Sequence, residues 1–171
     1  MKRAAFLVAT AATAMSSGSV ARASQPYELP SVMIVSKSSN RNEVHYAAYV
    51  DEQCAPATPR PVHAYWLMLE RGPGITEPLS RGEARVLGIA NQEVSGDAIR
   101  FVVSGMPSRT FVAHTGRGAD GTCTSRVDTT IAGTQARLLS IHVKQSLFGV
   151  DYVLLTGSTA DGKAVQERVS P

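Results

Sequence analysis

The chain has 171 residues, 43% of them hydrophobic, and carries 17 Lys and Arg against 14 Asp and Glu. Its basic residues are scattered singly, without the dense cluster that nucleic-acid binding usually shows, so we expect no nucleic-acid partner. Its apolar runs are shorter than the roughly 20 residues that span a bilayer, so we predict no transmembrane segment.

The N-terminus has the pattern of a secretory signal peptide. Lys2 and Arg3 precede an apolar run over residues 4–15, and small residues follow as far as an Ala-Arg-Ala triplet at residues 21–23. A positive head, a short hydrophobic stretch and an Ala-x-Ala cleavage site together predict export. We therefore expect residues 1–23 to be removed and the protein to work in the periplasm or the medium.

Residues 24–171 would then form a single exported domain. Three of the 17 basic residues leave with the signal, so 14 bases balance 14 acids, and the basic pI of about 9.1 belongs mostly to the signal. An exported chain with an even number of cysteines favours a disulfide between Cys54 and Cys123, which would close a loop of about 70 residues. The alternative is two unpaired thiols on different faces.

The first half of this domain predicts strands separated by turns and one proline-rich loop. A short apolar run covers residues 32–35, and residues 43–51 alternate in character as a half-buried strand does. Three prolines place residues 54–61 in a loop. Residues 62–69 are apolar on both faces and contain Trp66, which predicts a central strand covered on both sides.

One short helix is predicted near residues 79–90. Ser80 and Glu83 fit a capping box, in which each side chain satisfies a backbone amide of the other residue. Val86, Leu87 and Ala90 follow at helical spacing. A helix of this length is too short to be stable alone, so we expect it to dock on the strand at residues 62–69.

The remainder predicts strands with Gly-containing turns between them. These strands cover residues 98–104, 109–114, 122–131, 136–146, 150–156 and 164–169. Short strands at this spacing, linked by hairpin turns, are typical of an all-β domain. The fold class predicted is mainly β, an antiparallel β-sandwich or barrel of about 7–9 strands with the one docked helix.

No pattern in the sequence identifies a catalytic or metal centre. The four histidines are His45, His63, His114 and His142, and none has the spacing of zinc ligands. No nucleophile elbow or phosphate-binding loop with its proper context is present. We predict no catalytic residue, no metal and no cofactor, although a triad assembled from distant residues stays open.

The aromatic residues divide between the two faces of the predicted strands. One set is expected to form the core: Tyr46, Trp66, Phe101 and Phe111. The opposite faces carry His45, Tyr49, His63 and Tyr65. If those faces line a cavity, these four residues bind a ligand; if they meet the helix, they form a second core layer, which the large rings favour.

Two segments resemble a known family. Residues 61–70, read with residues 77–80, Glu83 and Gly88, are similar to the central block of the bacterial domain-of-unknown-function family 4833. Residues 150–157 and 162–169 resemble the end of that family. The resemblance spans most of the exported domain and implies no established activity.

These observations favour an exported, non-enzymatic binding module for a small apolar ligand or a partner protein, because barrels and sandwiches bind ligands at a mouth or an open face. The alternative is an exported hydrolase or metal-dependent enzyme that uses His63 or His114.

Overall fold

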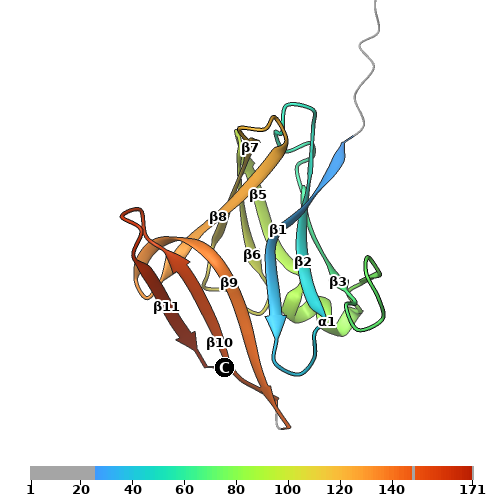
Figure 1. Ribbon diagram of the computed structural model, residues 1–171, viewed down its shortest axis with the longest axis vertical. Helices are drawn as coiled ribbons and strands as arrows, with labels where there is room; N and C mark the ends of the chain where they lie inside the picture. The colour runs from blue at the N-terminus through green and yellow to red at the C-terminus, as the bar shows by residue number, and fades with distance from the viewer. Residues whose placement is uncertain (1–25, 148, 171) are drawn as a thin grey trace, which may run out of the picture.

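The computed structural model describes residues 26–147 and 149–170, and the predicted signal peptide lies outside them. Within these ranges eleven strands and one helix follow one another along the chain (Figure 1). They are β1 Tyr27–Lys37, β2 Glu43–Val50, β3 Val62–Leu67, β4 Thr76–Pro78, α1 Arg81–Leu87, β5 Ile89–Ser95, β6 Ala98–Val103, β7 Phe111–Arg117, β8 Cys123–Ile131, β9 Thr134–Ser146, β10 Gly149–Ser158 and β11 Ala164–Val169.

The strands form one branched sheet organised around β9. At Arg137, β9 pairs with β8 and β10, whereas at Ile141 it pairs with Val35 of β1 and Leu155 of β10. Because a strand has two edges, β8 and β1 share one edge of β9 in succession and β10 occupies the other. The order is β4-β3-β2-β1-β9-β8-β7-β6-β5, with β10 and β11 as a side branch. The β1–β9 pair is parallel, and the other strand pairs described are antiparallel.

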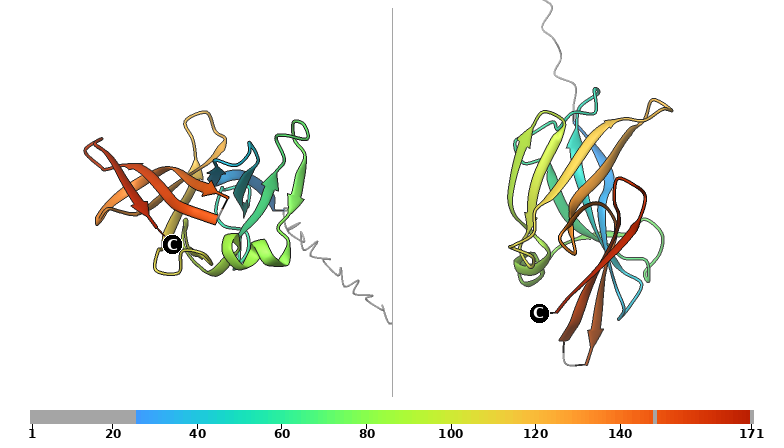
Figure 2. Two further views of the ribbon diagram at one scale, coloured as in Figure 1. Left: turned by 90° about the horizontal axis from the view of Figure 1, so that it is seen from below. Right: turned by 90° about the vertical axis from the view of Figure 1, so that its left-hand side faces the viewer.

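Two arms of this sheet lie face to face and enclose the core (Figure 2). We call β1–β4 the first leaf and β5–β8 the second leaf. Tyr46 of β2, Phe101 of β6 and Phe111 of β7 are buried in a stack between them, with ring centroids 6.4 and 5.5 Å apart. Buried rings contribute large apolar areas, so this stack joins the two leaves. These three residues and Trp66 were predicted as core because they are large aromatic rings in predicted strands, and the prediction is confirmed.

The sheet is not closed by a backbone ladder, but one side chain bridges its open side. Gln92 of β5 donates from Nε2 to the carbonyl of Val62 in β3 at 3.0 Å and accepts from the Val62 amide at 2.9 Å. A primary amide presents an N–H donor and a carbonyl acceptor side by side, as a peptide group does, so it can replace one rung of a ladder. Val62 is buried, so its backbone groups would otherwise lack partners.

We expect Gln92→Ala to lower the free energy of unfolding by about 2 kcal/mol, because it leaves two buried backbone groups unpaired. Urea unfolding measures this loss, and amide hydrogen exchange at Val62 should accelerate. Asn91→Ala, an exposed neighbour on the same strand, is the matched control and should change stability by less than about 0.5 kcal/mol. Unchanged exchange at Val62 in the Gln92 variant would show that the bridge does not form.

The helix covers one end of the space between the leaves (Figure 1). The predicted capping box is present, with Ser80 as N-cap accepting from the Glu83 amide at 3.3 Å and Glu83 accepting from the Ser80 amide at 2.8 Å. The helix ends earlier than predicted. Gly88 turns the chain into β5, and a Cβ there would lie only 2.3 Å from the Ala84 carbonyl oxygen.

A disulfide joins the leaves at the opposite end. Cys54 follows β2, Cys123 begins β8, and their Cα atoms are 5.4 Å apart. The Tyr27 hydroxyl contacts both sulfur atoms. The predicted pairing of the two cysteines is therefore confirmed, and the bond links connections that lie far from α1 in Figure 1.

The predicted class, mainly β with one short helix, is confirmed, but two details differ. The strand count exceeds 7–9 because β4 and β5 were not predicted; residues 89–95 continue directly from the helix and have few apolar side chains. The strand predicted over residues 62–69 is not central. It is second from the sheet's end, and only Val62 and Trp66 of β3 are buried.

Candidate functional site

An apolar cavity of about 500 Å³ lies between α1 and the sheet near β9. Its floor consists of two rungs of side chains that pair across strands and therefore point to the same face. One rung crosses β1, β9, β10 and β11 and consists of Lys37, Val143, Val153 and Val169. The other crosses β3, β2, β1 and β9 and consists of Trp66, Val44, Val35 and Ile141.

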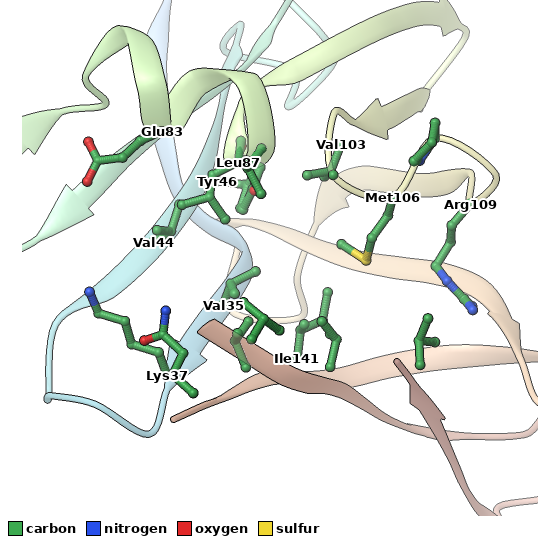
Figure 3. A pocket seen from close by; sticks show the side chains of 18 of the residues that line it. Val35, Lys37, Val44, Tyr46, Glu83, Leu87, Val103, Met106, Arg109 and Ile141 are labelled. Atoms are coloured by element: carbon green, nitrogen blue, oxygen red, sulfur yellow. The ribbon is translucent and has the colours of Figure 1, made fainter. Parts of the chain in front are cut away.

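The roof of the cavity comes from α1 and the connection between β6 and β7. Figure 3 shows Leu87, Val103 and Met106 above Val35 and Ile141. Gly105 lets these two segments touch, since its amide donates to the Val86 carbonyl at 2.7 Å and a Cβ there would lie 2.8 Å from the same oxygen. The cavity is thus assembled from seven strands, the helix and a loop, which are far apart in the sequence.

Two side-chain hydrogen bonds hold the helix over the cavity. The Tyr46 hydroxyl donates to the Leu87 carbonyl at 2.7 Å, and Trp66 Nε1 donates to Glu83 Oε1 at 3.0 Å. Burial raises the pKa of the Tyr46 phenol well above its ordinary value, so it stays a neutral donor. None of the helix residues is buried. The roof is therefore attached by these hydrogen bonds, by the backbone bond from Gly105 to Val86 and by the partly buried Leu87, which packs against the core.

Three charged residues border this apolar space: Lys37, Glu83 and Arg109. The hydrogen bonds from Ser80, and then those from Trp66 and the charge of Lys37, hold the pKa of the Glu83 carboxyl below its ordinary value. Arg109 donates to Glu167 at 2.8 Å and to the Thr130 carbonyl. Both Glu83 and Arg109 thus have partners within the protein.

The four residues predicted to face a ligand lie together, but on the other face of the first leaf. Tyr49 stacks on His63 at 4.7 Å between centroids, and His63 and His45 lie 6.0 and 5.9 Å from Tyr65. None of the four lines the apolar cavity. The helix does not meet them either, because it docks on Tyr46 and Trp66, so the expected second core layer beneath the helix is wrong.

Carboxylates accompany several histidines without forming a cluster of metal ligands. Glu43 lies 3.0 Å from His45, Glu28 lies 3.7 Å from His63, and Asp128 lies 3.4 Å from His114. In the part of the chain that the structure describes, no three His, Cys, Asp or Glu side chains gather as a metal site would require. The His63 Nδ1 atom is enclosed there without a hydrogen-bond partner.

A second depression, of about 630 Å³, lies beside β8, β9 and the end of β10. Charged and polar side chains make up most of its wall, among them Arg126, Asp128 and Arg137. Neither His63 nor His114 lines either depression. The apolar cavity beneath α1 is therefore the better candidate site, since ligand sites are mostly apolar with a few polar groups.

Sequence reasoning missed this cavity because its residues look like ordinary core positions. Val44 and Ile141 alternate with polar residues and Val35 ends a short apolar run, as many buried strand residues do. The pairing of β1 with β9 joins positions about a hundred residues apart. One signal was available. The sequence predicts one short helix that must dock on the sheet. A helix of that length covers only part of a sheet face, so an uncovered area beside it was to be expected.

The comparison with protein-family models agrees with the sequence resemblance, as described below. The comparisons with curated proteins and with solved structures found no match to this chain. The structure describes no helix with the length and apolar character needed to cross a membrane. The model of one family, described as a domain of unknown function (DUF4833), matches residues 33–168. This match covers most of the chain and the residues that line the cavity, except Val169 and Ser170, and the chain therefore belongs to the DUF4833 family.

Proposed function

We propose that the domain binds a small molecule with an apolar body in the cavity beneath α1, and that it does so after export. The observation that carries the proposal is the cavity of about 500 Å³, which has the size of sites for drug-sized ligands. The disulfide supports export, because such bonds persist in oxidising compartments.

The character of the wall supports an apolar ligand. Valine, leucine, isoleucine and methionine side chains from both the floor and the roof face the same space. Covering apolar surface contributes about 25 cal/mol per Å² removed from water, so a ligand that fills the space gains affinity without specific contacts. The second depression, beside β8 and β9, has mostly charged and polar side chains in its wall and offers no comparable apolar surface.

The attachment of the roof supports entry of a ligand. The helix has no fully buried residue, and Leu87 is its one hydrophobic residue packed against the core, so few of its own apolar contacts must separate when it lifts. Segments with few buried contacts open locally at low cost in free energy. The bonds from Tyr46 and Trp66 can then re-form over a bound molecule.

The test is a calorimetric titration of the full chain with dodecanol. Val153→Trp adds a large side chain to the floor and should weaken binding at least about tenfold, which corresponds to about 1.4 kcal/mol. Val112→Trp is the matched control, because Val112 is half-buried on the outer face of β7 and does not line the cavity. Circular dichroism should show the same β-rich fold for both variants.

Absence of saturable binding to the unmodified protein would contradict the proposal. Equal binding by Val153→Trp and the unmodified protein would also contradict it, because the ligand would then lie outside the cavity. If Tyr49→Ala abolished binding instead, the site would be the aromatic face that carries His45, Tyr49, His63 and Tyr65, as the sequence predicts.

A further inference from the structure

Of the charged side chains at the cavity, Lys37 makes no ion pair within 4.0 Å among the described residues, although its charge acts on Glu83 in the same wall. Lys37 ends β1, and its Nζ lies 4.3 Å from the centroid of the Trp66 ring. Among the residues that the structure describes, no carboxylate oxygen lies within 4.0 Å of Lys37 Nζ. The ammonium group therefore keeps its donors available where the cavity floor ends.

The other charged residues at the cavity are already satisfied. Both oxygens of Glu83 accept hydrogen bonds, one from the Ser80 amide and one from Trp66 Nε1. Arg109 is paired with Glu167, whose second oxygen accepts from the Ala132 amide at 2.8 Å. These bonds hold Glu83 and Arg109 in place. Since both already have partners within the protein, neither is the best candidate to bind the polar group of a ligand.

A second donor comes from β9, two residues beyond Val143, the strand partner of Lys37. Gln145 lines the same cavity, and its Oε1 accepts from the Ser39 hydroxyl at 2.6 Å. This bond assigns the Gln145 oxygen to Ser39 and leaves its amide nitrogen as a donor. The unmatched polar groups at this end of the cavity are thus both donors, and one of them carries a positive charge.

From this arrangement we infer that the ligand is an anionic amphiphile, with its apolar body in the cavity and an anionic head group that accepts hydrogen bonds from Lys37 and Gln145. This inference rests on the proposed function and adds to it the charge and direction of the ligand. The Trp66 ring beneath Lys37 positions the ammonium group by cation–π attraction. A hydrogen bond between charged groups is stronger than one between neutral groups, so the head group contributes both affinity and orientation.

The experiment compares three probes that share a chain but differ in head group: dodecanoate, dodecanol and dodecyltrimethylammonium. Calorimetry on the unmodified full chain should give dodecanoate the highest affinity, about tenfold above dodecanol, with dodecyltrimethylammonium the weakest. In Lys37→Met, which keeps the apolar stem, the preference for dodecanoate over dodecanol should disappear. Dodecanol affinity should stay within about twofold.

Two further variants control for charge and fold. Lys163→Met removes an exposed lysine that pairs with Asp161 and does not line the cavity, so it should keep the full preference. Lys37→Arg should keep most of it. Equal affinities for dodecanoate and dodecanol in the unmodified protein, or a preference that survives Lys37→Met, would overturn the inference while leaving the cavity as the site. Failure of all three probes to bind would overturn the proposed function and this inference together.

Discussion

Replacing both cysteines by alanine should lower the free energy of unfolding by about 4 kcal/mol. The bond joins residues separated by 69 positions, and closing so long a loop removes much of the conformational entropy of the unfolded chain. It also links the two leaves at the end where neither β9 nor α1 connects them. Equilibrium unfolding in guanidinium chloride, with linear extrapolation, measures the difference.

Alanine is preferred to serine in this experiment because Cys54 is buried, and a serine hydroxyl there would add its own cost. Chemical reduction of the unmodified protein should give a similar loss and serves as the control. Affinity for a cavity ligand should be unchanged in the folded variant, because the bond lies far from the cavity. A loss below about 1 kcal/mol would mean that the unfolded chain does not gain the expected freedom.

Phe101→Ala should cost about 4 kcal/mol of stability. Phe101 is almost fully buried and lies between Tyr46 of the first leaf and Phe111 of the second, so truncating it empties the middle of the aromatic stack. The removed ring loses its transfer free energy, and the space left behind adds a further cost because the leaves cannot collapse onto it completely. Thermal and denaturant unfolding both report this change.

The matched control is Tyr49→Ala on the outer face of β2. Tyr49 is also an aromatic residue in a stack, but 37% of it is exposed. Its removal should cost about 1 kcal/mol or less, as is usual for surface positions. Similar losses for the two variants would show that the leaves are not held together by the stack of Tyr46, Phe101 and Phe111.

Alternation along the strands was sufficient to separate the two faces of the first leaf. It placed Tyr46 and Trp66 on one face and His45 and Tyr65 on the other, which the structure reproduces. It could not indicate which face the helix covers, because that depends on the path of the chain between β4 and β5. In the structure the helix is bonded to the face of Tyr46 and Trp66, and the acceptor for Tyr46 is the Leu87 backbone carbonyl, which no side-chain pattern reveals.

The cavity was beyond sequence reasoning for a different reason. Its floor depends on the parallel pairing of β1 with β9, a contact between distant segments that no hairpin signal marks. Lys37 illustrates this. It is the last residue of β1, and nothing in the sequence around it indicates a binding site. The strand register places it beside Val143 and in line with Val153 and Val169. Only that register makes it part of a site.

The most direct test of the central claim is methyl-selective NMR of the full chain during a titration with dodecanol. We predict saturable shifts of the Val35, Ile141 and Val153 methyl groups, which line the cavity. The Ala47 methyl, on the face of β2 that carries Tyr49, should stay unchanged. Shifts confined to Ala47 and its neighbours, or no saturable shifts at all, would contradict a ligand site beneath α1.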